Sequence, residues 1–326
     1  MFSGLKRRGD LRRPFAFIHS QAANHPNRSH CISPRPVQDV LTGDPSEFYE
    51  YAQSSRAVPL RIRSPARADE SMANELLSRL RDAEDRIIEV EMGCYDEVVA
   101  GSFEKISMRL GHYLDWLESD ESIGGKVSGR QLYLAQWRAS DDIQSLADII
   151  RPPTLLAPLM QNDNACIDLY QTSFFIGPAG AVTPLHYDPY FNLYQVYASS
   201  EPARYAKHVF LLPPHAREFV MRVDGHHALQ NTSSINLSLS PSQHGDNLNI
   251  IADPGTPSRS VDAISQLGYS CVLQEGETLF IPKGWWHRVE NVVLGHSVGQ
   301  TKPSCPGWTA AIGWWWLPRR RDISSS

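Results

Sequence analysis

The stretch GAVTPLHYDPYFNLYQVY, residues 180–197, carries the pattern around which the rest of this chain can be interpreted. It contains His186 and Asp188, separated by one residue. On an extended strand, residues i and i+2 project from the same face, so an imidazole and a carboxylate would stand side by side. They would form two thirds of a 2-His-1-carboxylate site, which binds Fe(II) and leaves coordination positions open. The third ligand would be a distant histidine, for which the candidate is His287 in GETLFIPKGWWHRVENV.

The same H-x-D pattern occurs a second time, at His244-Gly245-Asp246. That copy lies in SLSPSQHGDNLN, whose Ser, Asn, Gly and Pro residues are typical of a solvated loop. The first copy instead follows a strand-like run at residues 172–176 and a turn at 177–180, and it precedes another strand-like run at 193–197. We therefore expect His186 at the mouth of a barrel of strands, where small-molecule sites tend to form.

Several segments, taken in order, resemble the JmjC family of Fe(II)- and 2-oxoglutarate-dependent oxygenases. The likeness is closest to the small stand-alone JmjC hydroxylases, the group of JmjC domain-containing protein 5, and it covers residues 34–318. The matching segments are QLYLAQ (131–136), TPLHYDPYFNLYQVY (183–197), KHVFLLPP (207–214), GETLFIPKGWWHRVENV (276–292) and the closing WWW (314–316). The resemblance implies a mainly β fold with a helical annex, built on a double-stranded β-helix, the jelly roll of cupins.

The resemblance also implies roles for individual residues. His186, Asp188 and His287 would hold Fe(II), with 2-oxoglutarate as co-substrate and O₂ at the open positions. Four residues match family positions that bind 2-oxoglutarate: Lys207 at its far carboxylate, Tyr133 and Thr183 as hydroxyls of the same pocket, and Asn192 near the metal. Phe175, Tyr187, Trp286 and Trp314 are the expected substrate-pocket residues.

Each of these positions also has a plainer interpretation. His287 could belong to an aromatic cluster with its tryptophan neighbours, and Lys207 could lie on a strand edge at the surface. Tyr133 could be core, Thr183 a turn residue, and Asn192 the end of a strand. These interpretations predict no convergence of the residues in space, whereas the family roles do.

Two departures from the family pattern bear on the site. SSEPARYA, residues 199–206, stands where the family has a tight glycine turn, so the match of Lys207 is made across an insertion. Gly313 in AAIGWWW stands where the family often has Asn or Ser, and it offers no side-chain donor to the co-substrate.

Composition limits the class of protein. The chain has 326 residues, 41% of them hydrophobic, and a formal net charge of −5, so it has no overall basic field for nucleic acid or anionic membrane. No apolar run approaches the ~20 residues of a membrane helix. The five cysteines are scattered without a C-x-x-C motif, which fits a reducing compartment and argues against a cysteine zinc site.

The chain divides into four expected parts, the third of which contains an insert. Residues 1–36 form a basic, flexible tail, 37–130 a bracing region of helices and strands, 131–318 the catalytic barrel, and 319–326 a short tail. Within the barrel, the polar residues 225–266 are expected to be a mobile lid or partner-binding loop. We expect an intracellular protein, nuclear or cytoplasmic; the alternative, from the Arg-rich and acid-poor N-terminus, is a mitochondrial transit peptide.

The expected activity is hydroxylation of a protein side chain by an Fe(II)- and 2-oxoglutarate-dependent dioxygenase. The alternatives are a JmjC lysine or arginine demethylase and a tRNA-modifying JmjC hydroxylase. A non-catalytic JmjC module would usually lack a metal ligand, and a cupin enzyme without 2-oxoglutarate would not need Lys207. The expected partner is a protein or peptide substrate, RNA being disfavoured by the acidic balance; no membrane is expected, and a homodimer stays open.

Overall fold

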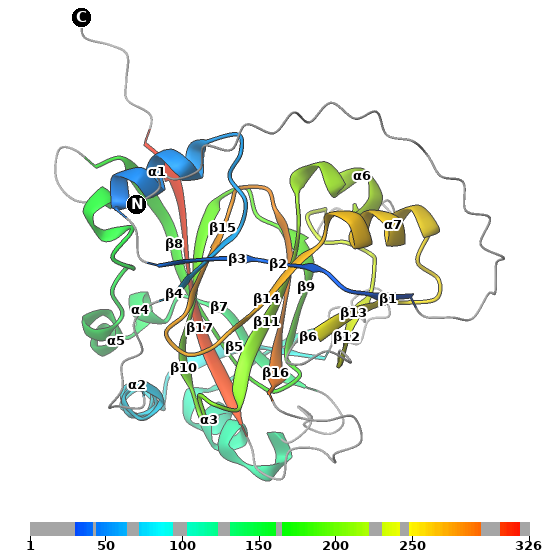
Figure 1. The fold of residues 1–326 in the computed structure, drawn as a ribbon. Coiled ribbons are helices and arrows are strands. Elements are labelled where there is room, and N and C mark those ends of the chain that lie inside the picture. Colours follow the sequence, from blue (N-terminus) through cyan, green and yellow to red (C-terminus); the bar gives the residue numbers. More distant parts are fainter. Residues whose placement is uncertain are drawn as a thin grey trace, which may run out of the picture.

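The computed structural model describes residues 30–41, 44–63, 72–93, 103–122, 131–160, 165–221, 230–241, 248–294 and 307–319. Within these ranges the chain forms two sheets of nine and five strands, with a smaller three-stranded sheet beside them. Figure 1 shows the strands of the two larger sheets running side by side through the centre of the molecule, with the helices outside. This arrangement is the mainly β, cupin-like fold that the sequence predicts.

The nine-stranded sheet is the larger wall. Its order is β3 (Gln38–Leu41), β4 (Leu60–Arg63), β15 (Thr278–Ile281), β10 (Phe191–Ser199), β17 (Trp308–Pro318), β8 (Ile167–Pro178), β7 (Leu132–Trp137), β5 (Ile87–Met92) and β6 (Glu104–Arg109). The five-stranded sheet is the smaller wall, in the order β2 (Arg35–Pro36), β14 (Tyr269–Leu273), β11 (Tyr205–Leu212), β16 (Trp286–Val293) and β9 (Val182–Tyr187). The third sheet contains β1 (His30–Ile32), β13 (Leu248–Ala252) and β12 (Leu237–Pro241).

The side-chain alternation of the strands separates two hydrophobic clusters across the larger sheet. On β17, Ala311 and Trp315 belong to the cluster between the two large sheets, together with Phe175 and Val209. Trp314, from the opposite face of β17, belongs to the cluster on the outside of the larger sheet. Because neighbouring residues of a strand point to opposite faces, a shift of one residue along β17 exchanges these environments.

Helices cover the outer face of the larger sheet, at the left and bottom of Figure 1. They are α1 (Pro45–Gln53), α2 (Met72–Arg81), α3 (Leu110–Glu118), α4 (Ala139–Asp142) and α5 (Gln144–Ile149). Helix α1 begins after Asp44, whose Oδ1 accepts hydrogen bonds from the backbone N–H groups of Ser46 and Glu47 and so caps the helix. Helices α4 and α5 are both short and are divided at Ile143.

The expectation of a polar lid at residues 225–266 is wrong. Its described parts contain β12, β13 and most of α7 (Ser258–Leu267), and these elements form a third hydrophobic cluster against the outer face of the smaller sheet. Ile250 and Ile264 are fully buried there. The strands contain the short apolar runs LSL and LNIIA, which lie between turn-forming residues. Because the segment as a whole is polar, the strand periodicity of these short runs is hard to recognise in the sequence.

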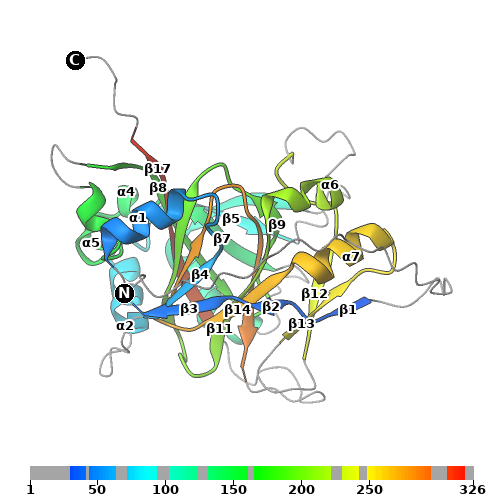
Figure 2. The ribbon, with the colours of Figure 1, turned by 45° about the horizontal axis from the view of Figure 1, so that its top comes forward.

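The N-terminal boundary also differs from the expected one. Residues 30–32 form β1, which pairs antiparallel with β13, and residues 35–36 form β2, which pairs in parallel with β14. The segment from β1 to β3 therefore runs past the third sheet and both larger sheets, as the dark blue strands of Figure 2 show. Residues 1–29, in which the basic tail and its mitochondrial alternative were expected, lie outside the described residues.

Candidate metal centre

Two neighbouring strands bring the predicted metal ligands together. In the register between β9 and β16, His186 lies directly opposite His287, and their ring centroids are 4.1 Å apart. Asp188 follows the end of β9, where its carbonyl oxygen accepts a hydrogen bond of 2.9 Å from the backbone N–H of Gly284. Gly284 is the turn residue just before β16 and has a φ of 78°, a conformation that glycine adopts without a steric penalty. The turn thus ties Asp188 to the start of the strand that carries His287.

The carboxylate of Asp188 lies close enough to both imidazoles to share one metal ion with them. Oδ2 of Asp188 lies 4.0 Å from Nε2 of His186 and 3.7 Å from Nε2 of His287. Two ligand atoms that each lie ~2.1 Å from one ion can be at most ~4.2 Å apart. Within the described residues these three form a His/Asp cluster whose ligand atoms all lie within 4.8 Å of one another. The donor set of two imidazoles and one carboxylate fits a divalent transition metal such as Fe(II).

Backbone carbonyls orient both imidazoles toward that point. Nδ1 of His186 lies 2.8 Å from the carbonyl oxygen of Pro184, and Nδ1 of His287 lies 3.1 Å from that of Trp285. A carbonyl can only accept, so each Nδ1 is the donor of its hydrogen bond, and each Nε2 is the ring nitrogen left to bind a metal. Metal-binding histidines are commonly held in this way through their second nitrogen.

The carboxylate has a fixing partner as well. The indole Nε1 of Trp315 donates a hydrogen bond of 2.8 Å to Oδ2 of Asp188. Burial raises the pKa of Asp188, but His186, His287 and this hydrogen bond outweigh it, so the pKa lies below its usual value. Burial, with repulsion from His186, lowers the pKa of His287 to about 4. Near neutral pH the site therefore presents a carboxylate and a neutral His287, which are the forms that bind metals.

Lys207 lies in the interior of the same barrel. Its side chain is fully buried, and its Nζ donates a hydrogen bond of 2.6 Å to Oδ1 of Asn291, the residue opposite it on β16. Burial lowers its pKa to about 7. The ammonium lies 5.8 Å from the ring centroid of Tyr133. Because a lysine ammonium has three N–H donors, further donors remain for a ligand in the interior.

A strand irregularity places Thr183 with these residues. The register of β9 against β16 shifts between His287 and Val289, so Thr183 pairs with Val289 although His186 pairs with His287. Thr183 therefore shares a face with His186, three residues away, where regular alternation would put it on the other side. Its hydroxyl donates to the Tyr133 hydroxyl at 3.5 Å, a weak contact.

The interior also contains buried polar atoms without partners in the described part of the chain. Oδ1 of Asn192 and the hydroxyl of Tyr194 make no hydrogen bond there, although both residues are almost completely buried. Asn192 lies opposite Trp315 in the register of β10 against β17, so both face the metal ligands. Buried polar groups are normally paired, so these two atoms mark a polar part of the barrel interior that has room for a hydrogen-bonding partner.

The turn at residues 199–206 does not displace Lys207. Strand β10 continues to Ser199, whose hydroxyl donates to the carbonyl oxygen of Tyr205, and β11 then begins at Tyr205. The chain passes from the larger to the smaller sheet in this turn. Lys207 consequently starts the inward-facing series of β11, with Val209 and Leu211.

Three of the four expected substrate-pocket residues do not face the metal centre, which corrects the prediction. Trp314 lies in the cluster under the outer helices. Trp286 lies in the cluster on the outer face of the smaller sheet, and Tyr187 packs against it there, with their ring centroids 4.9 Å apart. Phe175 does face inward, 5.9 Å from the ring of Trp315. Alternation counted from His186 and His287 would have excluded Tyr187 and Trp286 from the start.

Sequence reasoning missed Trp315 and Asn291. Trp315 is one of three consecutive tryptophans, and only the strand register shows which of them points inward. Asn291 joins Lys207 to the barrel wall, because its amide also donates to the carbonyl oxygens of Gly177 and Pro178 at 2.7 and 2.9 Å. Strands are depleted in Asn, so an asparagine within the strand-like run after His287 could have indicated a specific role for Asn291.

Gly313 has a steric explanation. A Cβ added there would lie 2.6 Å from Cη2 of Trp315, closer than real contacts allow. The indole that binds Asp188 thus occupies the space that a polar side chain at position 313 would take. The second H-x-D copy, His244-Gly245-Asp246, lies outside the described residues.

The fold and this site together define a class of protein. The chain matches the model of the cupin-like domain family over residues 42–322, and it belongs to that family. It is also a distant relative of JmjC proteins.

Three relatives illustrate this relationship. The chain is 29% identical over 170 residues to "Lysine-specific demethylase JMJ30" of Arabidopsis thaliana, 28% over 168 residues to "Jumonji C domain-containing protein 5" of Drosophila melanogaster, and 30% over 169 residues to "Lysine-specific demethylase 8" of Xenopus tropicalis. Each match covers 51% of this chain and 32%, 35% and 32% of the respective relative. The chain therefore matches about a third of the length of these relatives.

None of the described helices is both long enough and apolar enough to cross a membrane.

Proposed function

We propose that this protein is an Fe(II)- and 2-oxoglutarate-dependent dioxygenase that hydroxylates a side chain of a protein substrate. The observation that supports this most is the combination of His186, Asp188 and His287 with a fully buried lysine, Lys207, inside one barrel. A metal triad alone is also compatible with cupins of other chemistry. A buried ammonium beside the triad is costly unless the site receives an anion.

With Fe(II) bound, 2-oxoglutarate and O₂ would convert a substrate C–H group to C–OH, leaving succinate and CO₂. The chain's own residues position and shield this chemistry. His186, Asp188 and His287 would hold the metal on one side and leave the opposite positions open. The Lys207 ammonium would neutralise the far carboxylate of 2-oxoglutarate, with the hydroxyls of Tyr133 and Thr183 as further donors.

Aromatic residues would keep water from the reacting groups. The ring centroid of Phe175 lies 5.7 Å from that of Tyr194 and 5.9 Å from that of Trp315, whose indole binds Asp188. Excluding water strengthens the electrostatic interactions between the charged groups of the site. Asn192 lies opposite Trp315 on the inward face, and the NH₂ group of its amide would donate to the co-substrate near the metal.

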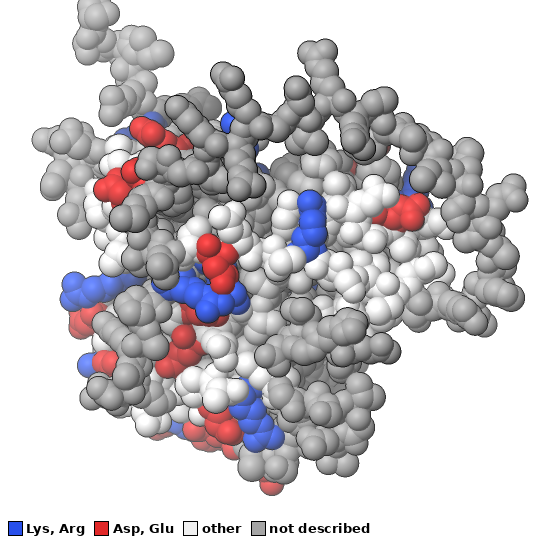
Figure 3. Space-filling view, viewed as in Figure 1, with Lys and Arg blue, Asp and Glu red and all other residues white. Residues whose placement is uncertain are grey.

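Demethylation is the second candidate, because two of the relatives named above are called lysine-specific demethylases. The same hydroxylation, on a methyl carbon attached to nitrogen, gives an unstable product that releases formaldehyde. An RNA substrate has less support. On the face of the molecule that Figure 3 shows, acidic side chains lie beside the basic ones on the described surface. An RNA-binding surface would instead be expected to carry a continuous basic stripe.

The test is an anaerobic titration of the Fe(II)-loaded protein with 2-oxoglutarate, followed by visible absorption. Chelation of the metal by 2-oxoglutarate should give a metal-to-ligand charge-transfer band that saturates at one equivalent. Asp188→Ala should give no band, and succinate formation should require Fe(II) and O₂. An Fe(II)-loaded protein without the band would refute the use of 2-oxoglutarate.

A further inference from the structure

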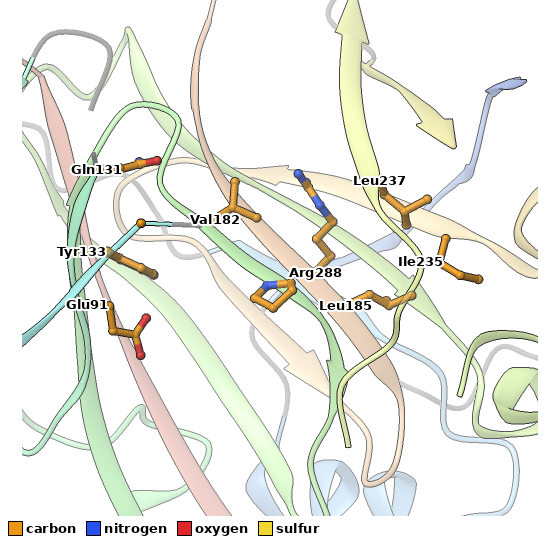
Figure 4. Close-up of a pocket in the computed structure, with 10 residues that line it drawn as sticks. Glu91, Gln131, Tyr133, Val182, Leu185, Ile235, Leu237 and Arg288 are labelled. Carbon is orange, nitrogen blue, oxygen red and sulfur yellow. The ribbon is translucent and has the colours of Figure 1, made fainter. Parts of the chain in front are cut away.

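Two wall residues of the pocket in Figure 4 point away from the metal ligands. Leu185 precedes the ligand His186 on β9. Likewise, Arg288 follows His287 on β16, so both wall residues project from strand faces opposite to the ligands. The side chains of His186 and Asp188 are nevertheless 12% and 19% exposed. The approach to the metal is therefore at the end of the barrel where β9 ends and β10 begins, the segment that contains Asp188.

Two stacked tyrosines lie at that end of the barrel. Tyr190 follows Asp188 by two residues, and its ring centroid lies 4.3 Å from that of Tyr170, with 14° between the ring planes. Tyr190 also packs against the interior cluster that contains Trp315, the partner of Asp188. Tyr170 is 57% exposed, and among the described large hydrophobic residues only Ile87 is similarly exposed. Single exposed rings are common on protein surfaces, but this ring continues an aromatic row that begins at a metal ligand.

A β-bulge gives Tyr170 its position at the rim of the barrel. Gln171 lies opposite Trp315 in the register of β8 against β17. Leu169, two residues earlier, lies opposite Trp316 and packs in the outer cluster, so Tyr170 is the extra residue of β8. Bulges occur next to active sites, where they re-aim a side chain. The bulge directs Tyr170 toward Tyr190, whereas Leu169 lies under the outer helices.

Two exposed cations flank the stacked rings. Arg138, which follows β7, donates a hydrogen bond of 2.9 Å from Nη2 to Oε1 of Gln171, the neighbour of Tyr170. Lys283 immediately precedes Gly284, whose backbone N–H binds the carbonyl oxygen of Asp188. Neither cation forms an ion pair with another described residue. The rim of the barrel thus offers a guanidinium and an ammonium beside an aromatic surface.

This combination favours an acidic peptide that carries an aromatic residue. An aromatic side chain can stack on the exposed ring of Tyr170, and carboxylates complement the two cations. The carboxylate of β8, Asp168, does not compensate these cations, because it already pairs with Arg319 at 2.8 Å. A cationic side chain, another common partner of a tyrosine ring, would be repelled by them.

Single-stranded RNA is the other polymer that aromatic rings and cations bind. Two separate cations do not form a continuous basic track, and the whole chain has a net charge of −5. The charge distribution therefore favours a peptide over RNA.

We propose that the stack of Tyr170 and Tyr190 is a docking platform for an acidic segment of the protein substrate, and that it holds an aromatic residue near the residue that is oxidised. The carboxylates of that segment would pair with Arg138 and Lys283. This inference rests on the proposed oxygenase function, because it assigns part of the same substrate.

The experiment is a selection from a phage-displayed library of random dodecapeptides. The full chain, loaded with Fe(II) and 2-oxoglutarate, is immobilised without oxygen, and the bound peptides are sequenced and aligned. We expect Phe, Tyr or Trp to be enriched about three- to tenfold at one aligned position, the order that an aromatic pair contributes, with Asp or Glu enriched beside it. Tyr170→Ala should remove the aromatic enrichment, and Tyr170→Phe should keep it. Arg138→Gln combined with Lys283→Gln should remove the acidic enrichment.

Ile87→Ala and Arg109→Gln are the matched controls, because these two exposed residues lie opposite each other on β5 and β6, at the edge of the larger sheet. Both should keep the peptide preference, and thermal unfolding of all variants shows which are folded. Selected peptides without an aromatic preference, or a preference that survives Tyr170→Ala, would overturn the platform. A labelled oligouridylate that binds the chain and is lost in Tyr170→Ala would assign the rings to RNA instead. The charge-transfer band, which none of these variants should alter, separates these results from a failure of the oxygenase proposal.

Discussion

The indole of Trp315 donates its only N–H group to the carboxylate of Asp188 at 2.8 Å, across 127 residues of the chain. Strand β17 therefore supports the metal site although it supplies no ligand. Gly313 has no side chain, so the indole of Trp315 can occupy the space beside it and reach the carboxylate. The interaction is a testable link between the sheet register and the chemistry of the site.

Trp315→Phe should weaken metal binding by ~10–100-fold, the usual effect of losing a hydrogen bond to a ligand. The ring remains, so the packing on Phe175 is largely kept. The matched control is Trp314→Phe, on the opposite face of the same strand, which should leave the metal dissociation constant unchanged. Fe(II) or Co(II) titration of both variants measures the difference. Equal affinities in the two variants would mean that the hydrogen bond does not support the site.

Asp188→Ala should remove the only anionic ligand and lower the iron content of the purified protein sharply, because two neutral imidazoles compensate the metal charge poorly. His244→Ala, in the second H-x-D copy, should leave iron content and turnover unchanged. Metal analysis after reconstitution distinguishes the two. A large loss of iron in His244→Ala would show that the wrong triplet has been assigned.

Lys207→Ala should lower the affinity for 2-oxoglutarate by two or more orders of magnitude. Removing one partner of a buried charge pair costs ~3–5 kcal/mol, and each ~1.4 kcal/mol is a factor of ten. Metal binding should hardly change. Arg204→Ala is the control, since Arg204 pairs with Glu201 in the turn before β11. Titration of the charge-transfer band gives both constants, and normal 2-oxoglutarate affinity in Lys207→Ala would remove Lys207 from the pocket.

Lys207 should also make the stability of the metal-free protein depend on pH. Burial lowers its pKa to about 7, whereas an unfolded chain keeps a lysine pKa of ~10.4. Between these values the unfolded state binds one more proton, so the free energy of unfolding should rise with pH. Urea midpoints at ~pH 7.5 and ~pH 9.5 measure this rise, and Lys207→Met should flatten it. Parallel curves for the two proteins would contradict a lowered pKa.

Ile250→Ala should destabilise the protein by ~2–5 kcal/mol, as usual for a large-to-small change in a core. Ile250 is fully buried in the cluster of β12, β13 and α7. An effect near zero would restore the idea of a polar lid at residues 225–266. The measurement is urea unfolding, with Leu239→Ala as a partly buried comparison expected to cost less.

Much of the site could be predicted from the sequence alone. A histidine and an aspartate two residues apart on a strand must share a face. The aromatic segment around His287 matches a segment of a known family, and the matching segments follow one another in the same order along the chain. The motif order therefore established the cupin-like fold and indicated the three ligands that the structure brings together. Local chemistry of this kind depends on residue spacing within single strands, which the sequence contains completely.

Only the tertiary structure decided which neighbours of these residues face inward. The choice among Trp314, Trp315 and Trp316 depends on the register of β17 against β10, and the position of Thr183 depends on an irregularity between β9 and β16. Likewise, the polar residues 225–266 contain a small core because β13 pairs with β1 from the far N-terminal end. Register and long-range pairing arise from contacts between distant segments, and a one-residue shift reverses every side chain of a strand.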